Sequence, residues 1–242
     1  MKKVFTVVIF FTAELITATA QKRLARIANG DNYLNIREQE SSDSRIIGSI
    51  EAGDFFYVTP DEDIWWAAQS LSGKTGYVFH SRVELIDSLP PSELKNLFSN
   101  VFENEKEIAL NYSFISSKFS LTKKKWESKS DSINFKKTKS LLSKYSREKF
   151  FPLLNVFPSY FCQADDSDLA RVFLSTFIIS SLSDSGEVKN CFARCYRCDS
   201  VLVEKIISYF PVLDQKKMQQ LIDSIQKNIY PEDRDSIQQM RE

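Results

Sequence analysis

The chain contains a single histidine, His80, among its 242 residues. Hydrolases that work through a Cys–His pair need a histidine next to the nucleophile, and most zinc hydrolases need histidine ligands. His80 directly follows a strand-like Gly-Tyr-Val run, where a surface position is the simpler interpretation, and no second histidine is present. The sequence therefore excludes both kinds of chemistry.

Glycine is also scarce, and its distribution is uneven. Five of the six glycines precede residue 77: Gly30, Gly48, Gly53, Gly73 and Gly76. They punctuate short runs of Val, Ile, Tyr, Phe and Trp, which is typical of tight turns between strands. No phosphate-binding loop or dinucleotide fingerprint is present. A glycosidase that uses only carboxylates stays formally open, because such sites have no short motif. We expect a protein that is not an enzyme and needs no cofactor or metal.

Long apolar runs are absent as well. The longest, Val4–Ala13, has about half the ~20 residues needed to span a bilayer. Lys2 and Lys3 precede it and Ala18-Thr19-Ala20 follows, which is the order of a secretory signal peptide. We expect residues 1–20 to be such a signal, and the mature protein to be exported, periplasmic or extracellular.

The chain has no net charge, with 32 basic and 32 acidic residues, so nucleic acid is not an expected partner. The charges are nevertheless segregated. Residues 31–86 hold ten acidic and four basic residues, whereas residues 121–150 hold ten basic and three acidic ones. The two segments either attract each other within one molecule or form two separate solvated faces.

The basic segment, Lys123–Lys149, also contains the aromatic residues Trp126 and Phe135. This mixture suits peripheral contact with an anionic polymer or membrane surface. A mobile segment, or the solvated side of a helix, is the alternative interpretation.

The pattern changes at Leu89-Pro90-Pro91-Ser92, which predicts a domain of strands at residues 21–88 and a helical domain at residues 89–242. Strands are expected near Tyr33–Arg37, Arg45–Ile50, Phe55–Thr59, Ile64–Gln69, Gly76–Phe79 and Val83–Ile86.

Apolar residues in the second domain recur at helical spacing. The first such face is formed by Leu94, Leu97, Phe98 and Val101. We expect Asp165 or Asp166 to cap a helix that carries Leu169, Val172, Phe173 and Phe177. Another helix carries Val201, Val203, Ile206 and Ile207 and stops at Pro211, and Asp214 is expected to cap the last one. An antiparallel bundle or a short helical solenoid would accommodate these helices.

Several motifs of the first domain occur in one order: Leu34-Asn35-Ile36-Arg37, Ile47-Gly48-Ser49-Ile50, Trp65-Trp66, Gly73-Lys74-Thr75-Gly76-Tyr77-Val78 and Arg82-Val83-Glu84-Leu85-Ile86. In this order they resemble the bacterial SH3 domain family, over about residues 29–86. The resemblance implies a small SH3-like β-barrel that serves as a binding module. The implied ligands are cell-wall peptides or partner proteins.

The resemblance also suggests binding residues. In eukaryotic relatives the first tryptophan of the pair lines a groove for polyproline peptides, and Trp65 is the matching residue. The Pro and Tyr that complete that groove are replaced by Phe79 and Arg82, so the polyproline platform is incomplete. The aromatic candidates for a ligand-binding surface are Trp65, Tyr57, Phe56 and Tyr77. Because side chains alternate along a strand, about half of these should instead fill the barrel.

Four cysteines lie in the helical domain: Cys162, Cys191, Cys195 and Cys198. In an exported protein the first expectation is disulfides, and four cysteines allow three pairings. Neighbours four apart on a helix project side by side, so a bridge from Cys162 to the other three is geometrically easier. Four thiolates could hold zinc instead, although export argues against it.

Two sharper interpretations of the cysteines fail. The Cys-x3-Cys-x2-Cys spacing resembles the iron–sulfur motif of radical enzymes that use S-adenosylmethionine, but only 44 residues follow Cys198, too few for their barrel. Cys195-Tyr196-Arg197-Cys198 lacks the βαβ surroundings of a thioredoxin-like redox pair.

The sequence thus predicts an exported, non-enzymatic adaptor whose barrel recognises peptidoglycan peptides. The alternative is a scaffold for protein–protein interaction in the cell envelope, in which the helical domain engages an envelope protein.

Overall fold

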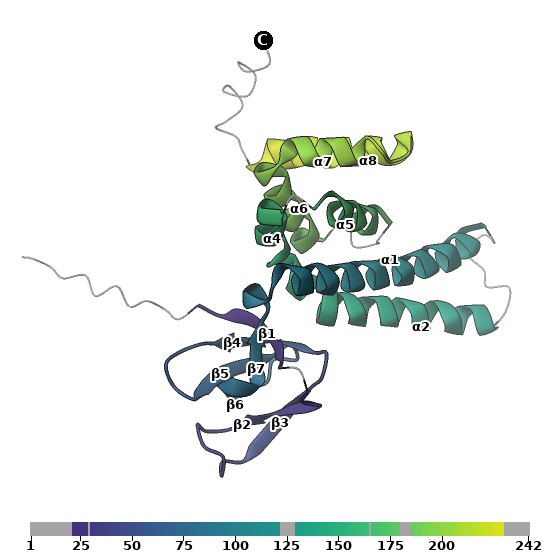
Figure 1. Ribbon diagram of the computed structural model, residues 1–242. Helices are drawn as coiled ribbons and strands as arrows, with labels where there is room; N and C mark the ends of the chain where they lie inside the picture. Colours follow the sequence, from purple (N-terminus) through teal and green to yellow (C-terminus); the bar gives the residue numbers. More distant parts are fainter. Residues whose placement is uncertain (1–20, 29, 122–128, 165, 180–184, 230–242) are drawn as a thin grey trace, which may run out of the picture.

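A computed structural model of the protein describes residues 21–28, 30–121, 129–164, 166–179 and 185–229 (Figure 1). The expected signal peptide, residues 1–20, lies outside the described residues, and so do Asp165, Trp126 and the first lysines of the basic segment. The β-barrel lies at one end of the molecule and the helices are stacked away from it (Figure 1).

Seven antiparallel strands form one curled sheet in the order β3-β2-β6-β5-β4-β1-β7. Six of them match the expected strands to within one residue at either end: β2 (Tyr33–Arg37), β3 (Ile46–Glu51), β4 (Phe55–Thr59), β5 (Trp65–Ser70), β6 (Thr75–Phe79) and β7 (Val83–Leu85). A 3-10 turn, η1 (His80–Arg82), joins β6 to β7. The SH3-like barrel followed by helices is therefore confirmed.

The strand that sequence patterning does not reveal is β1 (Arg23–Ile27), which pairs with both β4 and β7. Ala25 and Ile27 enter the barrel core, whereas Leu24 points the other way and packs among helical residues. Because both sides of β1 are covered, the strand lacks the polar-apolar alternation by which a half-exposed strand is recognised.

Strands β2 and β6 are neighbours in the sheet and cross at one pair, with Arg37 opposite Tyr77. At this crossing a Cβ on Gly76 would collide with the carbonyl oxygen of Arg37 and the side chain of Ile36. Only glycine lets the two backbones approach so closely.

A 3-10 turn, η2 (Ile86–Ser88), leads from the barrel into α1 (Pro91–Leu121), which begins at the expected proline. Helix α2 (Lys129–Tyr145) runs back beside α1 and continues into a π-helical turn, η3 (Ser146–Phe150) (Figure 1). The remaining helices are α3 (Phe151–Leu154), α4 (Phe157–Ala164), α5 (Ser167–Ile179), α6 (Gly186–Cys198), α7 (Ser200–Ile207) and α8 (Val212–Ile229).

The expected helix caps are only partly correct. Asp166 caps α5, since its Oδ1 accepts a hydrogen bond from the Leu169 N–H at 3.1 Å. Asp214 is not a cap, because α8 begins two residues earlier and places Asp214 in its first turn. Val201 does not face the core either, since it is largely exposed at the start of α7.

The interior consists of two apolar clusters. One fills the barrel, and Phe56, Val58, Ala68 and Val78 belong to it. The second fills the helical region but also includes four residues from before the predicted domain boundary or directly at it: Leu24, Phe55, Ile86 and Leu89. The barrel and the helices therefore share a continuous core that crosses the position where the sequence changes character.

Charged contacts reinforce this junction. The Lys149 ammonium in η3 lies 2.7 Å from Asp54 Oδ1 and 5.8 Å from the centre of the Phe55 ring. The Arg26 guanidinium in β1 donates to Glu93 Oε2 in α1 at 2.9 Å. Lys149–Asp54 joins the basic segment to the acidic one, so attraction within the molecule is present at this point.

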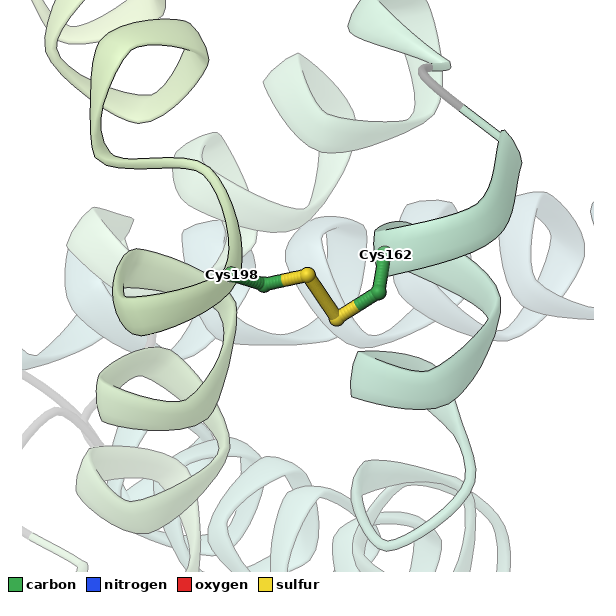
Figure 2. The surroundings of a disulfide bond; sticks show 2 residues. All are labelled: Cys162 and Cys198. Carbon is green, nitrogen blue, oxygen red and sulfur yellow. A yellow bond between two sulfur atoms is a disulfide. The ribbon is translucent and has the colours of Figure 1, made fainter.

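A disulfide links Cys162 in α4 to Cys198 at the end of α6 (Figure 2). This is a bridge from Cys162 to the other cysteines, as expected from helix geometry. Cys191 and Cys195 are buried free thiols. Burial, with a hydrogen bond to Cys195, raises the pKa of Cys191 well above the ordinary thiol value.

In the described part of the chain, no cluster of three or more His, Cys, Asp or Glu side chains is arranged to hold a metal ion. Within the same residues, no helix combines the length and apolar character required to cross a bilayer.

Candidate ligand-binding face of the barrel

Strands β4, β5 and β6 present one face to the barrel core and one outward. On the inner face, Val58 lies opposite Ala68, and all three strands contribute buried residues. Phe56 belongs to this face and is completely buried. Phe56 was expected among the surface aromatics, and that prediction is wrong because strand alternation directs its ring inward.

The other predicted aromatics lie on the outer face. Tyr57 is opposite Gln69, Ala67 is opposite Tyr77, and Trp65 is opposite Phe79. Directly opposed residues in an antiparallel pair project to the same side of the sheet. The three strands therefore bring together Trp65, Tyr57 and Tyr77, which are separated by up to 20 positions in the sequence.

A groove of about 330 Å³ lies between the tyrosines. Its floor is formed around Ala67, whose small side chain leaves space between Tyr57 and Tyr77. Concave sites with apolar walls and a few polar groups are the usual form of small-ligand sites. We name this surface, with Trp65 and Phe79 beyond the groove, the aromatic face.

Two charged side chains stand at the rim of the groove. The Lys22 ammonium donates to Gln69 Oε1 at 2.8 Å, and Glu38 pairs with Arg45 at 2.9 Å. The groove thus offers a cation and a carboxylate at its rim, and Thr59, Gln69 and Thr75 add polar groups between the two tyrosines. This arrangement suits a short peptide that carries both an acidic and a basic group.

Trp65 and Phe79 extend the apolar surface by one further pair. Their ring centroids are 5.5 Å apart in an edge-to-face arrangement, and Trp65 remains partly exposed. Phe79 is exposed on this face, although the sequence did not place it among the candidate binding residues. Counting along the hairpin that joins Trp65 to Tyr77 would have placed Phe79 on the same face.

Trp66 has a different role. Its Nε1 donates to the Asp61 carbonyl at 3.1 Å, its ring lies 5.4 Å from the His80 ring, and it packs against the barrel core. Trp66 therefore secures the β4–β5 turn and the end of β6, while Trp65 is the member of the pair on the aromatic face.

Arg82 stands where polyproline-binding relatives have a groove tyrosine. Its Nε donates to Asp31 Oδ2 at 2.7 Å and its Nη2 to the Tyr33 carbonyl at 3.0 Å. The hydrogen bond from Arg82 Nε to the Asp31 carboxylate lowers the pKa of Asp31. Arg82 thus ties the region around β2 to η1 and does not line a polyproline groove.

Comparison with known families agrees with this geometry. Residues 32–84 match the family model of the bacterial SH3 domain. The barrel is a bacterial SH3 domain. The matched range begins after β1, so the strand that links the SH3 domain to the helices lies outside it. No curated protein matches the chain. Bacterial SH3 domains are binding modules, often related to the cell wall, and the disulfide is compatible with a place outside the cytoplasm.

Proposed function

We propose that this protein is an exported binding protein that catalyses no reaction, and that its SH3 domain holds peptidoglycan peptides on the aromatic face. The observation that carries the proposal is the groove over Ala67, flanked by Tyr57 and Tyr77 and continued by Trp65. Aromatic side chains with an exposed edge dominate the energetics of many binding sites.

The chemistry of the ligand fits the rim of this groove. Stem peptides of the cell wall are short and carry both free carboxylates and amines, which Lys22 and Glu38 complement. The disulfide between Cys162 and Cys198 supports export, because such bonds persist in oxidising compartments.

Co-sedimentation with purified cell-wall sacculi tests the proposal. We expect the protein to sediment and Trp65→Ala to bind at least about 30-fold more weakly, the effect of losing a tryptophan hot spot of about 2 kcal/mol. Tyr33→Ala is the matched control. Tyr33 is an exposed aromatic of the same domain, but it lies at the opposite end of β2 from Arg37, which is the residue that pairs with Tyr77 on the aromatic face. Equal sedimentation of all three proteins, or of none, would contradict the proposal.

An envelope scaffold is the second candidate function, and an apolar corner between α7 and α8 favours it. Tyr209, Val212 and Leu213 are 69%, 79% and 74% exposed there, and α7 and α8 lie at the end of the molecule away from the barrel (Figure 1). A photo-cross-linker at position 213 should then capture one defined envelope protein, and Val212→Asp should abolish that product while Trp65→Ala leaves it unchanged. Absence of a defined product would remove this candidate.

A further inference from the structure

Both cysteines of the disulfide are exposed. Cys162 lies in the last turn of α4, and Cys198 is the last residue of α6 (Figure 2). Their neighbours Gln163, Ala164 and Arg197 are exposed as well. Cysteine is one of the residue types most often buried, so two exposed cysteines in one bridge are unusual. A thiol in solution can reach this bridge without unfolding the helices.

The other two cysteines are shielded from solvent. Cys195 and Cys191 lie one and two turns before Cys198 on α6, and each is only 2% exposed. Both belong to the helical core cluster. Burial raises the pKa of Cys191, which keeps this thiol protonated and unreactive. The four cysteines thus divide into one accessible bridge and two protected thiols.

The bridge lies where the outermost helices begin. The chain after Cys198 forms α7 and α8, at the end of the molecule away from the barrel (Figure 1). Asp199 joins α6 to α7, because its N–H donates to the Cys195 carbonyl at 3.0 Å and its Oδ1 accepts from the Leu202 N–H at 2.8 Å. The disulfide ties this junction to α4 and so fixes the start of α7.

Helices α7 and α8 are attached to the rest of the protein through one side. Their buried residues belong to the helical core cluster: Leu202, Val203, Ile206, Ile207, Met218 and Ile222. Val201 at the start of α7 is largely exposed, and so is the apolar corner between the two helices. A layer that packs through one side opens more readily than an enclosed one, so a covalent tie at its base has a large effect on it.

We propose that the Cys162–Cys198 bridge is a reversible redox clasp, which an external dithiol opens to loosen α7 and α8. One thiolate of the dithiol attacks a sulfur of the bridge. It forms a mixed disulfide with that cysteine, breaks the Cys162–Cys198 bond and releases the other cysteine as a thiolate. The second thiol of the dithiol loses its proton and displaces the first cysteine, so the dithiol is oxidised by two electrons and both cysteines are reduced. Exposed disulfides undergo such exchange, whereas shielded structural ones resist it.

Dithiothreitol is the probe, and a short pulse of iodoacetamide without denaturant marks the thiols that it frees, read by peptide mass spectrometry. We expect alkylation of Cys162 and Cys198 in the folded protein, while Cys191 and Cys195 stay unmodified. The matched control, Cys191→Ala/Cys195→Ala, should lose the bridge at the same rate. Reduction only at urea concentrations that unfold the protein would overturn the proposal, since the bridge would then be shielded. Reduction at least about tenfold slower in the control would overturn it too, because the buried thiols would then carry the exchange.

Hydrogen exchange measures what the bridge holds in place. In dithiothreitol, exchange of the α7 and α8 backbone amides should accelerate by a factor at least about tenfold greater than that of the β4–β6 amides. Cys162→Ser/Cys198→Ser should show the same pattern without reductant, and oxidised dithiothreitol should restore slow exchange in the parent protein. Equal acceleration in both parts would overturn the clasp, because reduction would then act only through global stability. Failure of oxidised dithiothreitol to restore the bridge would overturn its reversibility. Neither candidate function is needed for this exchange, so loss of wall binding in Trp65→Ala does not bear on it.

Discussion

Phe55→Ala tests whether the barrel and the helices unfold as one unit. Phe55 belongs to the barrel by strand pairing, but its ring is buried in the helical cluster with only 4% of the residue exposed, beneath the Lys149 ammonium. Truncation of a buried phenylalanine removes transfer free energy and leaves a cavity, which costs about 3–5 kcal/mol. For a protein of this length that loss lowers Tm by about 10 °C.

The assay compares two probes in urea and in thermal unfolding. Far-UV circular dichroism follows mainly the helices. In a Trp126→Phe background the two remaining tryptophans, Trp65 and Trp66, both lie in β5 and follow the barrel. We expect the two transitions to coincide before the substitution and to shift together after it.

Phe79→Ala is the matched control because it removes the same atoms from an exposed site. It should change the free energy of unfolding by less than about 1 kcal/mol. Two separate transitions in the parent protein would refute the argument from a shared core. A Phe55→Ala shift confined to tryptophan fluorescence would refute it as well.

Three further predictions concern stability. Cys162→Ser/Cys198→Ser should lower the free energy of unfolding by about 3–4 kcal/mol, since the bridge closes a loop over a sequence separation of 36, and should make Tm insensitive to reducing agent. Burial opposes ionisation of Asp166, but hydrogen bonds from the Leu169 N–H and from Lys95 outweigh it and lower the pKa of Asp166. The ionised Asp166 side chain therefore stabilises the protein fully above the unfolded carboxyl pKa of about 4, and this stabilisation is lost as pH falls through the lower pKa of the folded state. Asp166→Asn should reduce the loss of stability on acidification, measured by urea titrations at several pH values. Gly76→Ala should destabilise the barrel by about 1–3 kcal/mol in tryptophan-detected unfolding, because its Cβ has no space at the strand crossing; an unchanged midpoint would contradict the tight crossing.

The strands that the sequence predicts are those with turn residues at their ends, and β4 is among them although Phe55 and Phe56 are buried on opposite sides of it. Strands β2 to β7 are bounded by glycines and turn residues. Helix α5 is predicted by its capping residue, Asp166, and by the helical spacing of its apolar residues. Strand β1 is not predicted because no turn residue precedes it and because Leu24 and Ala25 are buried on opposite sides, which removes the alternation. Both sides of β1 are buried only because the helices pack against the barrel. This packing is a tertiary contact that no local sequence pattern indicates.

The candidate site shows the same limit. Alternation requires that only part of the run Phe55-Phe56-Tyr57 lies outside the barrel, but all three residues are aromatic, so the pattern cannot assign the register. The structure directs Phe56 into the barrel, Phe55 into the helical core and Tyr57 to the groove. The groove itself depends on Ala67 being small where strands β4 and β6 flank it, which is a property of cross-strand pairing and not of spacing along the chain.

The most direct test of the central claim is a chemical-shift titration of isotope-labelled protein with soluble peptidoglycan stem peptides. If the aromatic face is the binding site, the shifted resonances cluster at Trp65, Ala67 and Tyr77, with the Trp65 indole N–H among the largest. Tyr33 and the exposed lysines of α2 should not shift. Perturbations that cluster in the helical region, or no perturbation at millimolar peptide, would contradict the assignment of wall recognition to the barrel.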